Sequence, residues 1–212
     1  MKNGLSAIIK NQAWRGAPVL YKTAEEMLFL HGWLSKEEFH PSNLTEESID
    51  LLIQRCGKCE KVKEKKKGFG TGYNRIMVIL NRPVMMNRIE MTLYKTESVD
   101  LLRNMVKAIG FDLEECYTTN LIKCESDDAF TKPSDMIKNC MTILEKELNY
   151  YKPEIVIVMG EILPLQGIVK GSSGISWFNT EHPVSLLKNT VLKRPAWETL
   201  KLVKKKYAEL KK

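Results

Sequence analysis

Hydrophobic residues are distributed along this chain in two alternating patterns. Short, continuous apolar or β-branched runs predict four buried strands, at residues 75–80 (RIMVIL), 116–122 (CYTTNLI), 153–160 (PEIVIVMG) and 174–180 (GISWFNT). Apolar residues at helical spacing predict helices at residues 98–110, 134–151 and 194–212. Strands that alternate with helices indicate a parallel sheet covered on both faces. We therefore expect an α/β fold, a three-layer α/β/α sandwich with a central, mainly parallel four-stranded sheet.

The segment before the first strand has a different pattern. Residues 1–50 contain helical stretches and loops but no strand-like run. We expect them to form a helical N-terminal extension packed on a domain of residues 51–212. Ligands of parallel sheets bind beyond the carboxyl ends of the strands, which are here followed by polar residues in LNRP, TTN, MGE and NTEHP.

The composition is that of a soluble globular protein and adds a weak charge signal. Of the 212 residues, 43% are hydrophobic and 28% are charged, and the formal net charge is +7. This charge favours a polyanionic partner, although solvated surface lysines explain it equally well. The longest apolar runs, IMVIL and IVIVM, are too short to span a bilayer, and residues 1–14 lack the apolar region of a signal peptide. We therefore expect a cytoplasmic protein.

The cysteines suggest a metal site in such a reducing compartment. Cys56 and Cys59 are three positions apart, between a helical pattern and a run of lysines, and Cys124 and Cys140 follow later. A redox pair would lie between a strand and a helix, so four thiolates around one centre are favoured, either zinc or a 4Fe-4S cluster. Spacing does not separate these two, and four unrelated thiols remain an alternative. Cys116 lies inside a predicted strand and is expected to be a small core residue.

Several segments occur in an order typical of one enzyme family. They are the Cys56–Cys59 pair with its basic stretch, GFGTGYNRIMVIL, CYTTNLIKC, MIKNC, PEIVIVMG and TEHPVSLLKNTVLKRPAWETLKLVKK. In this order they resemble the family-4 uracil-DNA glycosylases, the iron–sulfur branch of the uracil-DNA glycosylase superfamily. The last segment, with its His-Pro, leucine pair and Lys-Arg-Pro-x-Trp, is the most similar. The resemblance runs from about Cys56 to the C-terminus, and residues 1–50 lie outside most of it.

The resemblance implies a cofactor and a partner. The cofactor would be a structural 4Fe-4S cluster held by Cys56, Cys59, Cys124 and Cys140, without a redox role in base excision, and zinc stays as the alternative. The partner would be single- or double-stranded DNA containing uracil or a damaged base, bound by a protein that is expected to be a monomer. The nucleotide would be flipped into a pocket, where cleavage of its N-glycosidic bond develops positive charge on the sugar and negative charge on the base.

Two polar residues match family positions that contact the base. Asn120 matches the asparagine whose amide, with a donor and an acceptor, reads the edge of uracil. The alternative is that it caps the turn after its strand. His182, in the His-Pro motif, would donate a hydrogen bond to the uracil oxygen where negative charge gathers.

The residues after His182 match the family's DNA-binding segment. Leu186 and Leu187 would fill the gap left by the flipped base, unless they pack in the core instead. Lys188, Lys193 and Arg194 would contact phosphates.

The loop after the first strand departs from the family pattern. Family-4 enzymes carry Gly-Glu-Ala-Pro-Gly there, and the acidic residue positions water, whereas this chain has Asn81 at the acidic position, keeps Pro83 and lacks both glycines. An amide orients water but carries no negative charge to stabilise the sugar cation. The family's stacking aromatic is matched best by Tyr94, and Glu90 is a candidate replacement for the lost acid.

Two hypotheses from different classes follow. The first is an enzyme that hydrolyses the N-glycosidic bond of uracil or another damaged base, with Asn81 and His182 as catalytic residues and Asn120, Tyr94 and Pro83 as substrate contacts. The second is an iron–sulfur protein with the glycosylase fold that binds DNA with weak or no catalysis. A zinc-held α/β domain without a nucleic-acid role is a third alternative.

Overall fold

The computed structural model describes residues 46–60, 62–81, 94–126 and 133–211, and all structural statements below concern these residues. The chain divides into two compact units, Met1–Asn43 and Leu44–Lys212, and every described residue belongs to the second. Most of the predicted N-terminal extension is therefore outside the described residues. The boundary expected at residue 50 falls inside a helix, α3 (Glu46–Arg55).

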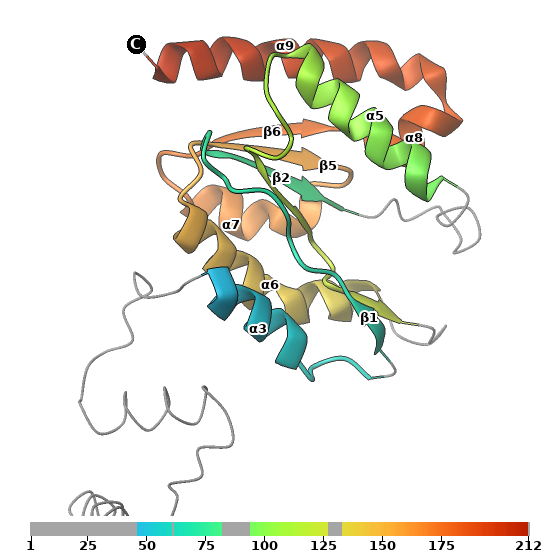
Figure 1. The fold of residues 1–212 in the computed structure, drawn as a ribbon, viewed down its shortest axis with the longest axis vertical. Coiled ribbons are helices and arrows are strands. Elements are labelled where there is room, and N and C mark those ends of the chain that lie inside the picture. The colour runs from blue at the N-terminus through green and yellow to red at the C-terminus, as the bar shows by residue number, and fades with distance from the viewer. Residues whose placement is uncertain (1–45, 61, 82–93, 127–132, 212) are drawn as a thin grey trace, which may run out of the picture. The chain divides into compact units, whose positions relative to one another are not determined.

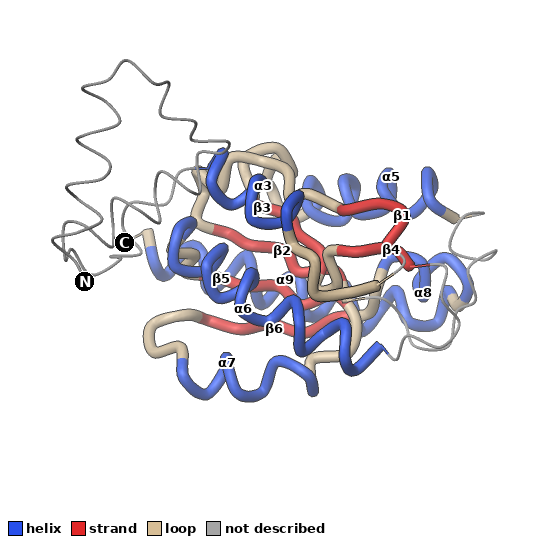
Figure 2. Tube along the Cα trace, turned by 90° about the horizontal axis from the view of Figure 1, so that it is seen from below, coloured by secondary structure: helices blue, strands red, loops and turns tan. Residues whose placement is uncertain are grey.

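The central sheet has four strands, all parallel, as the sequence predicts. They are β2 (Ile76–Leu80), β3 (Tyr117–Asn120), β5 (Ile155–Met159) and β6 (Ser176–Thr180), in the spatial order β3-β2-β5-β6 (Figure 2). The register places Leu80 beside both Asn120 and Met159, and Met159 beside Thr180. The carboxyl ends of all four strands therefore lie at one edge of the sheet.

Helices cover both faces of this sheet, so the predicted three-layer α/β/α sandwich is confirmed (Figure 1). Side chains of a strand alternate between faces. Ile76 and Val78 contact one helical layer, formed by α5 (Lys95–Ala108), α8 (Pro183–Lys188) and α9 (Lys193–Leu210). Met77 and Ile79 contact the other layer, formed by α6 (Pro133–Tyr151) and α7 (Gln166–Gly171). Two single 3-10 turns complete the helical elements, η2 (Leu163–Leu165) and η3 (Thr190–Leu192).

A small two-stranded ribbon was not anticipated from the sequence. Strand β1 (Val62–Lys65) pairs antiparallel with β4 (Cys124–Ser126), and Lys65 lies opposite Cys124. Both strands are polar and short, so they lack the apolar pattern that identified the main sheet. The ribbon joins the chain that follows Cys59 to the chain that follows β3. Nearby, Ile49 and Ile53 of α3 are buried against Ile143 of α6.

No helix among the described residues combines the length and the apolar character needed to cross a membrane.

Candidate functional site

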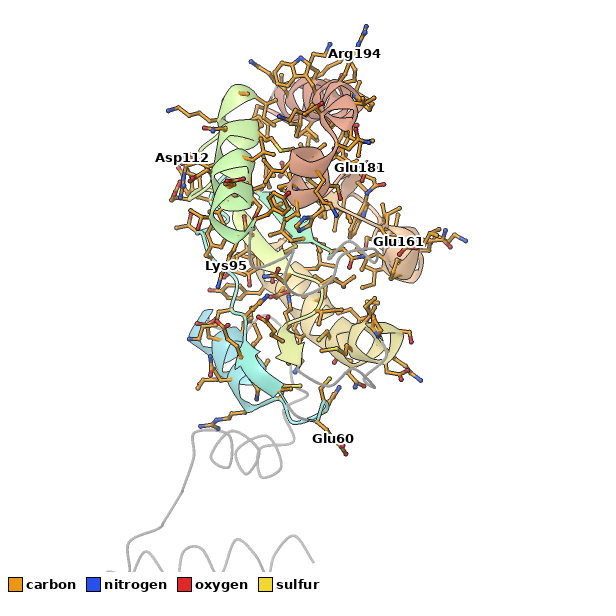
Figure 3. All side chains as sticks on the ribbon, turned by 90° about the vertical axis from the view of Figure 1, so that its right-hand side faces the viewer. Glu60, Lys95, Asp112, Glu161, Glu181 and Arg194 are labelled. Atoms are coloured by element: carbon orange, nitrogen blue, oxygen red, sulfur yellow. The ribbon has the colours of Figure 1, made fainter. Side chains whose placement is uncertain are left out.

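The carboxyl edge of the sheet collects polar residues from every strand. Asn120 ends β3, Asn81 follows β2, Glu161 follows β5 by two residues, and His182 follows β6 by two. Glu161 and Glu181 mark the ends of the two neighbouring strands β5 and β6 in Figure 3. Neighbouring strands are about 4.8 Å apart, so the backbones at the ends of β3 and β6 are separated by about 14 Å. This span is wide enough for a planar ring between two polar side chains.

Asn81 joins the ends of β2 and β5. Its backbone N–H donates to the carbonyl oxygen of Met159 (2.9 Å), and its side-chain Nδ2 donates to that of Glu161 (2.7 Å). The residue is buried, with 3% of its surface exposed. Because one amide N–H is committed to Glu161, the side chain can present its Oδ1 acceptor to a bound water.

Gly160 allows the close approach of these two strand ends. Its φ is +117°, and a Cβ at this position would be 2.3 Å from the carbonyl oxygen of Asn81. Its N–H donates to the carbonyl oxygen of Thr180 (2.8 Å), which ties β5 to β6. The hydroxyl of Thr180 is buried and has no hydrogen-bond partner within the described part of the chain. A small molecule bound at this edge would have an unsatisfied hydroxyl available to it.

His182 is the N-cap of α8 and is held in one orientation. Pro183 follows it in the first turn of the helix, and His182 itself is extended, with φ −63° and ψ 140°. Its Nδ1 accepts a hydrogen bond from the backbone N–H of Val184 at 3.2 Å. Burial, and after it the positive charge of Lys66, lowers the pKa of His182 to about 4. The ring is therefore neutral at pH 7, with its proton on Nε2.

Lys66, whose charge contributes to the lowered pKa of His182, belongs to the lysine run that follows Cys59. Lys66 directly follows β1, and its N–H donates to the carbonyl oxygen of Lys123 at 2.6 Å. Its ammonium forms an ion pair with Glu125 at 3.5 Å. Lys66, from the lysine run after Cys59, is therefore near enough to His182 for its charge to act on the imidazole.

Of the remaining candidate contacts with the base, the structure describes some and not others. Asn120 is half-buried at the end of β3. Tyr94 is half-buried and precedes the first residue of α5, Lys95, which Figure 3 labels. Pro83 and Glu90 lie outside the described residues, so their predicted roles remain predictions.

The leucine pair of α8 divides between the core and the surface. Leu186 is 1% exposed and packs in the core with β2, α5 and α9, whereas Leu187 is half-buried. Of the two roles considered for Leu186, its burial favours packing in the core over a DNA wedge, because its side chain packs against the sheet and α9. Val191 on η3 is 76% exposed and was missed. Leu187 and Val191 are therefore two apolar side chains of this segment that are not fully buried.

The cations predicted to contact phosphate surround this segment. Lys188 ends α8, and Lys193 and Arg194 open α9; all three are exposed. Arg194 lies at the outer end of the helical layer in Figure 3. Val191 is therefore an exposed apolar residue with basic residues on both sides in the sequence.

The four candidate ligand cysteines influence one another. Burial, and then negative charge on Cys140, Cys59 and Cys56, raises the pKa of Cys124 to about 11. Burial is also the main cause that raises the pKa of Cys140, and Cys59 and Cys56 add to it. The charges of Cys56 and Cys59 therefore act on both Cys124 and Cys140. Cys116, as predicted, is a separate core residue, with Sγ accepting from Nδ2 of Asn74 at 3.2 Å.

The ribbon brings the two halves of this cysteine group together. Lys65 lies opposite Cys124, and its Nζ donates to the carbonyl oxygen of Cys56 at 2.7 Å. On the other side, Nδ2 of Asn139, the residue before Cys140, donates to the carbonyl oxygen of Lys58 (3.1 Å) and contacts Sγ of Cys59 (3.5 Å). Even so, no three or more His, Cys, Asp or Glu side chains in the described ranges are arranged to hold a metal ion.

Comparison with known proteins identifies the family. The family model of the Uracil DNA glycosylase superfamily matches residues 69–201, which is more than half of the chain. The chain belongs to the uracil-DNA glycosylase superfamily. It is 27% identical over 121 residues to the type-4 uracil-DNA glycosylase of Saccharolobus solfataricus, and 23% identical over 120 residues to that of Archaeoglobus fulgidus. Each alignment covers 54% of this chain, and 56% and 60% of the respective relative, so less than two thirds of each relative is spanned.

The cysteine group can be tested against the iron–sulfur cluster that the sequence resemblance implies. Its donors are four thiols, of which Cys124 and Cys140 are buried without a disulfide partner. The backbone N–H of Lys123 donates to Sγ of Cys140 (3.4 Å), in the manner of the hydrogen bonds that tune cluster sulfurs. Thiols with raised pKa values need a cationic centre to become thiolates. The residues fit the cluster in the number and the chemistry of their donors.

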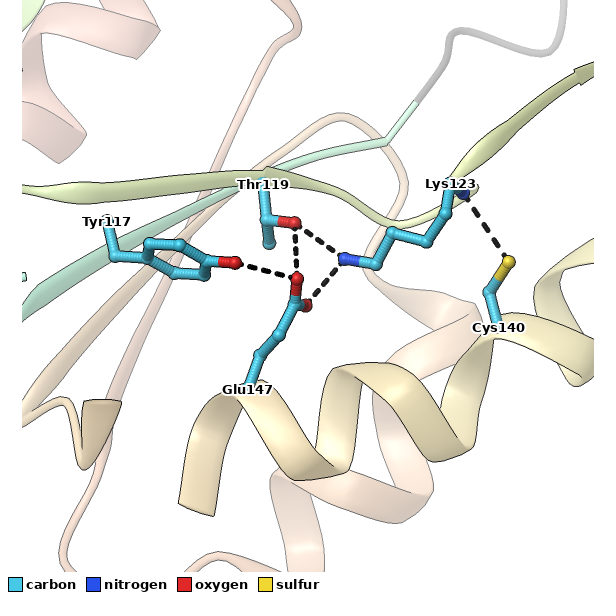
Figure 4. A network of polar contacts seen from close by, with 5 residues as sticks. All are labelled: Tyr117, Thr119, Lys123, Cys140 and Glu147. Carbon is cyan, nitrogen blue, oxygen red and sulfur yellow. Dashed lines mark hydrogen bonds and ion pairs between the residues drawn. The ribbon is translucent and has the colours of Figure 1, made fainter. Parts of the chain in front are cut away.

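One buried charged residue was not predicted from the sequence. It is Glu147 on α6, which is fully buried beside Tyr117, Thr119 and Lys123 (Figure 4). A signal was available, because Glu147 falls in the apolar helical repeat Cys140, Ile143, Leu144, Glu147, Leu148. A carboxylate on the buried face of a helix predicts a buried partner, and Lys123 is that partner.

Proposed function

We propose that this protein removes uracil, or another damaged base, from DNA by hydrolysing the N-glycosidic bond. The observation that carries the proposal is the state of His182 at the carboxyl edge of the sheet. Its ring is neutral, fixed by Val184 and protonated on Nε2. A neutral imidazole donates a hydrogen bond to an oxygen that gains negative charge, and such preorganised donors stabilise the departing base.

In the proposed reaction, water replaces the base on the sugar. The water oxygen bonds to C1′ of the sugar, the bond from C1′ to the base nitrogen breaks, and the base leaves as an anion stabilised by His182. The proton lost by the water neutralises the departing base. Asn120, half-buried at the end of β3, would bond the base edge through its amide, and Tyr94 would stack on the ring. Asn81 would hold the water through Oδ1, while Pro83 would line the pocket.

DNA would be held through the segment that follows His182. Lys188, Lys193 and Arg194 would contact phosphates and make affinity depend on salt concentration. Leu187 and Val191 would face the duplex in place of Leu186, which is committed to the core. Their role would be to occupy the space left by the flipped nucleotide.

The cofactor of the proposal is a 4Fe-4S cluster held by Cys56, Cys59, Cys124 and Cys140. When bound, the cluster would act structurally by fixing these cysteine segments to one another. Zinc would serve the same purpose and is the alternative. Neither takes part in the bond cleavage proposed here.

A second function is favoured by one observation, the presence of Asn81 where the family pattern has an acid. An amide does not supply the negative charge that stabilises a sugar cation, and this loss corresponds to a slower reaction by several orders of magnitude. Under this alternative the protein binds DNA containing a damaged base without cleaving the bond.

One assay separates the two functions. Purified holo-protein in excess is incubated with single- and double-stranded oligonucleotides that contain one uracil, and abasic sites are revealed by alkaline cleavage. We expect cleavage by the wild-type protein and a loss of about 100-fold or more for His182→Ala, because one preorganised donor is removed. Binding without cleavage would establish the binding protein instead. An unchanged rate for His182→Ala would remove this residue from the mechanism.

A further inference from the structure

A fully buried ion pair connects the central sheet to helix α6. Lys123 and Glu147 are both 0% exposed, and Nζ of Lys123 lies 2.5 Å from Oε2 of Glu147 (Figure 4). Burial lowers the pKa of Lys123, and the Glu147 carboxylate beside it opposes this effect by favouring the charged form. Such a pair persists in a protein interior only when its remaining polar atoms are also satisfied.

Two hydroxyl groups of strand β3 form hydrogen bonds with the remaining polar atoms of the pair. The hydroxyls of Tyr117 and Thr119 each donate to Oε1 of Glu147 at 2.9 Å. Nζ of Lys123 also donates to Oγ1 of Thr119 at 2.5 Å. Tyr117 and Thr119 are two residues apart and therefore point to the same face of β3. Burial, and then the charge of Glu147, raises the pKa of Tyr117, so its hydroxyl stays protonated and keeps donating.

Stability alone does not explain the pair. Well-packed apolar residues of similar volume commonly stabilise a protein as well as, or better than, a buried ion pair. Apolar residues do not fix the register of α6 against the sheet, because they pack in several positions. A charged pair with directional hydrogen bonds fixes it, because its hydrogen bonds are satisfied in one position only.

The register fixes two of the candidate ligand cysteines. Lys123 directly precedes Cys124, and its own N–H donates to Sγ of Cys140 at 3.4 Å. Glu147 lies seven residues after Cys140 on α6, which is about two helical turns, so both side chains leave the same face of the helix. A shift of α6 along the sheet would break the ion pair and separate Cys140 from Cys124 together.

The segment that follows the first cysteine pair also packs on this network. A Cβ at Gly68 would be 2.2 Å from the hydroxyl oxygen of Tyr117, so the backbone at Gly68 lies directly against the end of the network. Lys65 of the same segment pairs with Cys124 in the ribbon and bonds the carbonyl oxygen of Cys56. All three cysteine-bearing segments are thus positioned by contacts with, or next to, the buried network around Lys123 and Glu147.

We propose that Lys123 and Glu147 are positioning residues for the metal centre, holding the Cys56–Cys59, Cys124 and Cys140 segments in the register that captures and retains the cluster. This inference rests on the cofactor part of the proposed function. It is independent of whether the protein cleaves the N-glycosidic bond.

Its test is cluster retention rather than activity. Iron, zinc and acid-labile sulfide are measured per protein, and release of the metal to a chelator is followed by the absorbance near ~400 nm expected of a thiolate-bound cluster. The test variant is the double substitution Lys123→Met with Glu147→Leu, which replaces the pair by apolar side chains. Thr119→Val, which removes only hydrogen bonds, is a milder variant that decides the question if the double variant does not fold.

The matched control is Asn74→Ala. Asn74 is also buried and polar, and it makes two hydrogen bonds, to Sγ of Cys116 and from the N–H of Ile76 (3.0 Å), but it contacts none of the four candidate ligands. It therefore reports what a general loss of stability does to cluster retention. The melting temperature of each protein is measured in parallel after the metal has been removed.

We expect the double variant to fold and to release its metal about tenfold faster or more than the wild type, with Thr119→Val between them. Asn74→Ala should lower the melting temperature without changing the release rate in this way. Wild-type release rates in both network variants would overturn the inference while leaving the cofactor in place. A wild-type protein that carries neither iron nor zinc would remove the cofactor and this inference together, whereas the base-excision assay would still decide the proposed activity.

Discussion

The backbone N–H of Val184 donates to Nδ1 of His182 at 3.2 Å, and this one contact decides which ring nitrogen can serve a ligand. A neutral imidazole has one donor and one acceptor nitrogen. Since Nδ1 is used as the acceptor, Nε2 carries the proton. The cap geometry of α8 therefore turns a histidine that follows a strand into an oriented hydrogen-bond donor.

The first prediction concerns the titration of His182. Its pKa is lowered from 6.5 to about 4 by burial and by the charge of Lys66. Between these two pH values the unfolded chain binds a proton that the native state does not, so stability is present above pH 6.5 and is lost as the pH falls towards 4. The loss amounts to about 3 kcal/mol of unfolding free energy. NMR titration of the imidazole and urea unfolding against pH measure both effects.

His182→Gln is the reference protein, because glutamine does not titrate in this range. The difference in unfolding free energy between wild type and variant should change across pH 4–6.5 and stay constant above it. Lys66→Met should raise the pKa of His182 slightly, since the positive charge is the lesser cause. An imidazole that titrates near 6.5 in the folded protein would contradict the predicted burial and neutrality.

The second prediction concerns Asn81→Asp, which restores a carboxylate at the position where the family has an acid. The wild-type Nδ2 donates to the carbonyl oxygen of Glu161 at 2.7 Å. An aspartate there would lose the donor and place two oxygens in contact, at a cost of about 1–3 kcal/mol in unfolding free energy. The same contact raises the pKa of the introduced carboxyl, so the penalty is full at pH 7 and shrinks as the pH falls and the carboxyl is protonated.

Asn189→Asp is the control for this substitution. The side chain of Asn189 accepts, through Oδ1, from the N–H of Val191 at 3.1 Å, and an aspartate accepts as well as an asparagine does. Urea unfolding at pH 7 and pH 4.5 should show the pH-dependent penalty for Asn81→Asp alone. Equal stability of the two variants at pH 7 would mean that Asn81 does not bridge the strand ends as described.

The third prediction concerns Gly160, where the backbone conformation and the space both exclude a side chain. Gly160→Ala should reduce the free energy of unfolding by about 3 kcal/mol, because φ is +117° and the new Cβ would meet the carbonyl oxygen of Asn81. Gly167→Ala is the matched control, since Gly167 lies in α7 with no atom within 4 Å of its Cβ position. It should be neutral or add up to about 1 kcal/mol through helix propensity. Thermal and urea unfolding of both variants measure the contrast.

The sequence predicted the main sheet well because two of its strands, β2 and β5, are continuous apolar runs, and the other two, β3 and β6, contain β-branched or aromatic residues. Residues 75–80 and 153–160 contain β2 and β5, which are buried on both faces, so no other element suits them. The end of α5 was also correctly indicated by Gly110, which has φ +91° just after the helix. Local sequence patterns were sufficient to predict an element wherever the burial of that element depends on its own residues.

The rest depends on partners distant in the sequence. Strand β1 (VKEK) and β4 (CES) have no apolar pattern, and only their mutual pairing makes them strands. Lys123 and Glu147 are residue types that are rarely fully buried, and their burial becomes intelligible only when both are seen together. Which of Leu186 and Leu187 is buried likewise depends on the rotation of α8 about its axis relative to the sheet. The sequence of these two residues does not reveal that rotation.

The last prediction separates the core leucine from the exposed valine of the proposed DNA-binding segment. Leu186→Ala removes a side chain that is 1% exposed and should cost about 2–5 kcal/mol of stability, while the folded protein keeps its affinity for uracil-containing DNA. Val191→Ala removes a side chain that is 76% exposed and should leave the melting temperature unchanged while weakening duplex binding several-fold. Affinity measured by fluorescence anisotropy on double-stranded oligonucleotides, at one salt concentration and below the melting temperature of both variants, distinguishes these outcomes. Because single-stranded DNA has no stack to fill, the effect of Val191→Ala should be smaller there, and an equal loss on both substrates would assign Val191 to a contact other than the vacated space in the duplex.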